Sequence, residues 1–126
     1  MTILFINCKL FPFIDLIMQG LKTYETRNRN TLKALLGKRV FIAETGKGKK
    51  PVVRCCCTIA GMVTVTDRKT YNRYRKFTQI EKKSTYDWNS KTVKKCLYRL
   101  DNVEQCEPFE LPDNIVRHGR VYCETI

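Results

Sequence analysis

The longest β-like stretch of this chain, residues 52–66, restricts the possible folds more than any other feature. It is rich in valine, threonine and cysteine and contains no proline, so it favours extended backbone. Strands usually have about five or six residues, so a strand of this length has to bend. Gly61 lies inside the stretch and predicts a bend or bulge, as small barrels need where a strand turns a corner.

Shorter segments around this stretch complete an α+β pattern. Residues 2–6 predict a buried strand, and an apolar helical face follows Pro12, made of Ile14, Ile17, Met18 and Leu21. Gly20 can take the left-handed conformation that ends many helices. Further elements are expected as strands at 24–27, 39–44, 94–100 and 120–124, a short helix at 31–36 and an extended segment at 103–108.

The length of 126 residues fits a single domain spanning 1–126. Asp67 is placed to cap a helix, and residues 67–92 form a basic insertion that includes Trp88. The basic loop 46–51 lacks the spacing of a phosphate-binding loop and predicts a hairpin connection. The expected fold class is therefore α+β, a small mixed or antiparallel β-barrel with one to three short helices.

The seven cysteines show no CxxC spacing, and His118 is the only histidine, so neither a disulfide framework nor a metal site is predicted. We expect reduced thiols that are mostly packed inside the fold. The apolar run 59–65 is too short to cross a bilayer, and the N-terminus lacks the pattern of a signal peptide. The sequence therefore predicts a cytoplasmic protein with no membrane partner and no cofactor.

The net charge of +12 is unevenly distributed along the chain. Residues 21–50 carry nine lysines or arginines against two acids, and residues 68–95 carry ten against two. Residues 96–126 reverse this balance, with three basic residues against six acids. Two basic blocks beside an acidic tail favour a polyanion as partner, RNA or a nucleotide above all, over a merely solubilising surface.

The octapeptide at 20–27 combines Lys22, Glu25 and Arg27 where an apolar helix gives way to a strand. On a strand, Glu25 and Arg27 point the same way, and Lys22 in the preceding turn can fold back toward them. Lys22 and Arg27 can then bind a phosphate while Glu25 accepts a hydrogen bond from a base or ribose. Two other interpretations stay open: Lys22 as a nucleophile or base, and an inert network of ion pairs.

A basic and aromatic segment follows Asp67. The candidate nucleic-acid-binding residues are Lys69, Arg73, Arg75 and Lys76, beside Tyr71, Tyr74 and Phe77. These aromatic rings serve either as stacking surfaces for bases or as the core-facing stripe of a helix. Trp88 has the same two interpretations, and His118 is either a general base or a structural residue of the terminal strands.

The motif Gly20-x-Lys22-x-x-Glu25-x-Arg27, after a short strand and an apolar helix, resembles the GxKxxExR signature of ASCH domains, a PUA-like family of small β-barrels. Residues 98–103, 108–109 and 118–122 resemble the closing strands of that family. The resemblance implies a PUA-like barrel with a cleft beside the first helix, lined by Lys22, Glu25 and Arg27.

Relatives are linked to RNA binding, and some small members resemble amidohydrolases acting on acylated cytidine or are reported as ribonucleases. The amidohydrolase-like members have threonine at the position of Glu25 and a further carboxylate after the long strand. This chain offers only Glu81 or Asp87 for that second acid.

The primary hypothesis is an RNA- or modified-nucleotide-binding module. The first alternative is a hydrolase of an acyl amide or of RNA, in which Lys22 and Glu25 are catalytic and Arg27 orients the substrate. The second alternative is a protein-interaction domain. The ligand, the sequence preference and the oligomeric state do not follow from the sequence.

Overall fold

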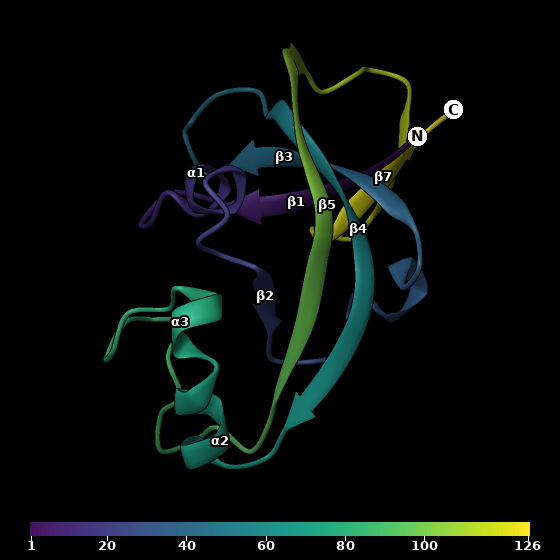
Figure 1. The fold of residues 1–126 in the computed structure, drawn as a ribbon. Helices are drawn as coiled ribbons and strands as arrows, with labels where there is room; N and C mark the ends of the chain where they lie inside the picture. Colours follow the sequence, from purple (N-terminus) through teal and green to yellow (C-terminus); the bar gives the residue numbers. More distant parts are fainter.

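In a computed structural model that describes all 126 residues, the chain forms one mixed seven-stranded sheet with short helices at its sides (Figure 1). The strand order is β2-β5-β4-β3-β1-β7-β6, in which β1 and β3 are parallel and every other pair is antiparallel. The strands are β1 (Thr2–Asn7), β2 (Tyr24–Arg27), β3 (Arg39–Thr45), β4 (Val52–Val65), β5 (Lys95–Glu110), β6 (Ile115–His118) and β7 (Tyr122–Thr125).

Two long strands, β4 and β5, form the central ladder and run almost the whole height of the molecule (Figure 1). Their register shifts between Ile59 and Gly61, so the irregularity predicted at Gly61 is present. β5 is longer than predicted, because it joins the expected strand at 94–100 and the extended segment at 103–108 into one element. Asn102 takes a positive φ of 52° between them, which lets the strand continue beyond a local irregularity.

The α+β class and the mixed sheet with three short helices are as predicted, but the barrel is open. The end strands of the sheet are β2 and β6, and they do not pair with each other. β2 has only four residues and pairs with β5 alone, so β2 and β1 are not joined by a backbone ladder. Glu25 and Arg27 of the octapeptide lie on this free-edged strand, and Lys22 precedes it.

The first helix, α1 (Phe13–Met18), buries Phe13, Ile14 and Ile17 in the main core. Gly20 has φ +78°, as expected for a residue that ends a helix. Because the helix ends this early, Leu21 does not join its apolar face and is 50% exposed. The helix predicted at 31–36 is a single 3-10 turn, η1 (Lys33–Leu35).

The insertion after β4 begins with α2 (Arg68–Arg73), which contacts β4, and α3 (Arg75–Thr78), which lies beside β2 (Figure 1). The Asp67 side chain accepts a hydrogen bond from the backbone N–H of Thr70, so the predicted cap is confirmed. Tyr71 is fully buried, and its ring lies 5.6 Å from that of Trp88, which identifies Trp88 as an anchor. Tyr74 packs on Tyr24 at a ring separation of 5.4 Å.

The cysteines are free thiols, and five of the seven are buried, in line with the predicted packing. Burial raises the pKa of both Cys55 and Cys57 to about 12, so these thiols are unreactive. No helix of the chain has both the length and the apolar character needed to span a membrane.

Candidate functional site

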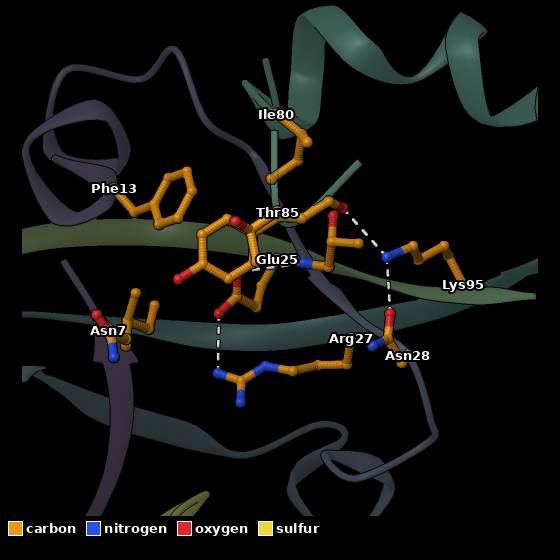
Figure 2. A pocket seen from close by; sticks show the side chains of 11 residues that line it. Asn7, Phe13, Glu25, Arg27, Asn28, Ile80, Thr85 and Lys95 are labelled. Atoms are coloured by element: carbon orange, nitrogen blue, oxygen red, sulfur yellow. Dashed lines mark hydrogen bonds and ion pairs between the residues drawn. The ribbon is translucent and has the colours of Figure 1, made fainter. Parts of the chain in front are cut away.

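A pocket of about 230 Å³ lies where β2 and β1 fail to pair, next to α1 (Figure 2). Segments far apart in the sequence contribute to it: β1, α1, β2, the insertion and the start of β5. The lining residues are Ile6, Asn7, Phe13, Glu25, Thr26, Arg27, Asn28, Ile80, Thr85, Tyr86 and Lys95. Glu25 is the only carboxylate among them.

Glu25 is a buried carboxylate with several donors around it. Its Oε2 accepts a hydrogen bond from Arg27 Nη2 at 2.9 Å, and its Oε1 accepts one from the Thr26 N–H at 3.1 Å. Burial alone would raise the pKa of Glu25, but Arg27 and Lys22 outweigh it and hold the pKa below its ordinary value. Glu25 is therefore an ionised acceptor, and two hydrogen bonds leave part of its accepting capacity free.

Lys22 does not line the pocket. Its side chain is fully buried, and Nζ donates to the carbonyl of Thr78 at 2.7 Å and lies 3.6 Å from Glu25 Oε1. The ammonium also sits 4.7 Å from the centre of the Phe13 ring. Burial lowers the pKa of Lys22, and the Glu25 carboxylate opposes that shift. In this geometry Lys22 acts on a ligand only through Glu25.

Arg27 spans the gap in the barrel. Its Nη2 donates both to Glu25 and to the backbone carbonyl of Phe5 on β1, the second at 3.1 Å. One guanidinium therefore joins β2 to β1 where no backbone ladder does. The Nε and Nη1 of Arg27 make no hydrogen bond within the chain, so their N–H groups remain free to donate to a ligand.

The free edge of β2 explains why consecutive residues reach one pocket. The alternation predicted for Glu25 and Arg27 holds, since the two form an ion pair. Thr26 points the other way on a strand but still lines the pocket, because no neighbouring strand covers that edge. The Thr26 hydroxyl is buried and has no hydrogen-bond partner. Buried polar groups are normally satisfied, so this one is a candidate ligand contact.

An aromatic wall and a second cation complete the pocket. Phe13 and Tyr86 meet edge to face at 5.5 Å. Lys95, which is 4% exposed, donates from Nζ to Asn28 Oδ1 at 2.7 Å and to the Tyr86 carbonyl at 3.1 Å. Figure 2 shows Lys95 and Asn28 together at one end of the pocket, with Phe13 nearer the other.

Sequence reasoning missed several of these residues: Thr26, Asn28, Tyr86 and Lys95. The octapeptide itself contains Thr26, but strand alternation predicts that Thr26 points away from Glu25 and Arg27, so it was not expected in the pocket. Tyr86 and Lys95 carried no local signal, because the docking of the insertion places Tyr86 and the pairing of β5 with β4 places Lys95. The only sequence signal for any of the missed residues is the pair of adjacent lysines, Lys94 and Lys95, at the start of β5.

The predicted nucleic-acid-binding residues divide into two groups. Lys69, Arg73 and Lys76 are exposed and have no carboxylate partner. Arg75 instead points inward, where it donates to Asp87 Oδ1 at 3.0 Å and to the Ile80 carbonyl at 2.9 Å. Its position fits a structural contact that fastens the insertion, and not a free phosphate-binding cation.

The two candidates for a second acid both lie outside the pocket. Asp87 accepts from Arg75 and from the N–H groups of Lys83 and Trp88, so its charge organises the insertion. Glu81 is exposed. His118 lies on β6, at the opposite end of the sheet from β2, stacked on Tyr122 at 4.4 Å.

No protein-family model matches the chain, and no curated protein does. Solved structures of an ASCH protein from Zymomonas mobilis do match. One is 23% identical, with a TM-score of 0.70, and the match covers 87% of this chain and 73% of the other. Two mutants of that protein give TM-scores of 0.69 at 23% and 22% identity; the matches cover 87% and 86% of this chain and 75% and 72% of theirs. This likeness establishes an ASCH-like, PUA-like fold.

Proposed function

We propose that this chain, which has the ASCH fold, binds RNA or a nucleotide by taking one nucleobase into the pocket beside β2. The observation that carries the proposal is the ionised Glu25 carboxylate beside the unpartnered Thr26 hydroxyl and an aromatic wall. Bases present N–H donors on their edges and flat apolar faces, and this pocket offers a partner for each.

The size of the pocket supports a single base. A volume of about 230 Å³ is below the range of roughly 300–1,000 Å³ that holds drug-sized molecules. The apolar faces of Phe13 and Tyr86 suit stacking or edge contact, which contributes about 1–3 kcal/mol per base. The phosphate or sugar then lies outside the pocket, near the free N–H groups of Arg27 and the lysines around the start of β5.

The carboxylate gives the proposal a chemical preference. Cytosine, adenine and guanine each carry an exocyclic amino group that donates to an acceptor such as Glu25. Uracil has no amino group, and its carbonyl oxygens repel a carboxylate. We therefore expect nucleoside 5′-monophosphates with amino-bearing bases to bind more tightly than uridine 5′-monophosphate.

Thr26→Val tests this site without a loss of stability. The change keeps the shape and removes a buried hydroxyl that has no partner, so the Tm stays the same or rises. Affinity for cytidine 5′-monophosphate, measured by calorimetry, should fall about fivefold, which corresponds to one hydrogen bond of about 1 kcal/mol. Thr64→Val, at an exposed position of β4, is the matched control and should leave affinity unchanged.

Equal affinity in the two variants, or no binding of any of the four monophosphates at millimolar concentration, would overturn the proposal. If this chain binds another protein specifically and binds none of the nucleotides, the result would instead favour a protein-interaction domain.

Hydrolysis remains the alternative, favoured by one observation: burial lowers the pKa of Lys22, as a catalytic amine requires. Two others weigh against it. Lys22 has no exposed surface, and no second carboxylate lines the pocket. Incubation with N4-acetylcytidine or labelled RNA separates the two functions. Product that disappears in Lys22→Ala supports a hydrolase, and unchanged substrate supports binding alone.

A further inference from the structure

A second hollow, of about 250 Å³, adjoins the base pocket at the start of β5. It is lined by Asn28, Thr85, Asn89, Lys91, Thr92, Val93, Lys94 and Lys95. Asn28, Thr85 and Lys95 line both hollows, so the two lie side by side. We call the second hollow the lysine groove.

Lys95 stands at the junction and is a buried cation without an anion. Its side chain is almost fully buried, and no carboxylate lies within ion-pairing distance of Nζ. Its two partners, Asn28 Oδ1 and the Tyr86 carbonyl, are neutral and occupy two of the three ammonium N–H groups. Buried charges are normally paired, and here the nearby Asp87 carboxylate acts only from beyond ion-pairing distance, so Nζ lacks a negatively charged partner in direct contact.

The rim of the groove adds charge and a fixed shape. Lys91 and Lys94 are exposed and form no ion pair within the chain. The turn that carries Lys91 is ordered by its own hydrogen bonds: Asn89 Oδ1 accepts from the Lys91 N–H at 2.8 Å, and the Asn89 N–H donates to the Thr92 hydroxyl at 3.0 Å. No acidic residue lines the groove.

A hollow beside Ile80 is less suitable for an anion. It shares only Ile80 with the base pocket, and it contains Glu81 as well as Arg73, Lys76 and Lys82. Its Arg75 is already engaged by Asp87. The lysine groove is therefore the better continuation for a polyanion.

We infer that the lysine groove binds a backbone phosphate of single-stranded RNA whose neighbouring base occupies the pocket, with Lys95 contacting the phosphate from below and Lys91 and Lys94 from the rim. The inference rests on the proposed function and deepens it: the ligand is one nucleotide within an RNA strand, not a free nucleoside. Phosphate contacts of this kind set position and affinity, while the pocket reads the base.

The test compares a fluorescently labelled eight-nucleotide RNA with cytidine across a salt series. Lys91→Gln/Lys94→Gln removes two exposed cations, so the fold is retained. Lys33→Gln/Lys38→Gln removes two exposed, unpaired cations elsewhere and is the matched control. We expect the groove variant to bind RNA about tenfold more weakly near 0.1 M salt, with a salt slope shallower by about 1.4, since each single-strand phosphate contact contributes about 0.7.

Cytidine affinity should be the same in the groove variant and the wild type. Equal weakening of RNA binding in the groove and control variants, or an unchanged salt slope, would overturn the inference. The proposed function would still stand in that case if the wild type binds cytidine. If the wild type does not bind cytidine, both the proposed function and the inference about the groove are wrong. Lys95→Met supplies a second check, because it should weaken RNA binding in a protein whose Trp88 fluorescence shows it folded.

Discussion

The buried charges of Lys22 and Glu25 should stabilise each other strongly, and a double-mutant cycle measures this coupling. Glu25→Gln leaves the fully buried Lys22 without its anion, and removing one partner of a buried pair costs about 3–5 kcal/mol. Lys22→Met leaves Glu25 paired with Arg27 but deprives the Thr78 carbonyl of its donor, which costs about 1–3 kcal/mol.

The double variant should be no less stable than Glu25→Gln alone, because Lys22→Met then removes an unpaired buried cation. If the single changes cost about 4 and 2 kcal/mol and the double about 3, the coupling is about 3 kcal/mol. A coupling energy of this size is large compared with a total free energy of unfolding of about 5–15 kcal/mol.

Urea unfolding provides the assay, with the fluorescence of Trp88, the only tryptophan, as the signal. Trp88 packs against Tyr71 and so reports on tertiary structure. The exposed pair of Arg99 and Asp101 is the control cycle and should show a coupling of about 0–1 kcal/mol. Additivity of Lys22→Met and Glu25→Gln within about 0.5 kcal/mol would refute the electrostatic description of the site.

Two further predictions concern pH and the loop beside Asn7. The pKa of Glu25 is lower in the folded protein than in the unfolded chain, so the ionised Glu25 stabilises the fold. This contribution to the free energy of unfolding is fully present above the pKa of the unfolded chain, and it is lost as the pH falls through the pKa of the folded protein. Between about pH 5 and pH 3 the wild type should therefore lose more free energy of unfolding than Glu25→Gln, and parallel losses in urea titrations would contradict this. Gly46 and Gly48 both have positive φ, but a Cβ at Gly46 would collide with the Asn7 side chain while one at Gly48 meets nothing. Gly46→Ala should destabilise the fold by about 1 kcal/mol more than Gly48→Ala in the same unfolding assay, and equal effects would show that the loop relaxes freely.

Features governed by local rules were predictable from the sequence. Gly61 marks the irregularity in the long strand, Asp67 caps α2, and Gly20 ends α1, each because a single residue type suits that backbone. The octapeptide also behaved as expected, since strand alternation alone places Glu25 and Arg27 on one face.

Features decided by tertiary contacts were not predictable. The open barrel follows from the pairing of β2 with β5 alone, and only the Arg27 side chain joins β2 to β1. Arg75 points inward because Asp87, twelve residues later, accepts its hydrogen bond. Tyr86 enters the pocket only through the docking of the insertion, and Lys95 through the pairing of β5 with β4, neither of which a periodicity reveals.

A crystal structure with cytidine 5′-monophosphate bound tests the central claim most directly. The account predicts the base against Phe13 and Tyr86, with its amino group roughly 3 Å from the Glu25 carboxylate and the phosphate on the side of Lys95. A nucleotide bound outside this pocket, or one whose base makes no contact with Glu25 or Thr26, would contradict it.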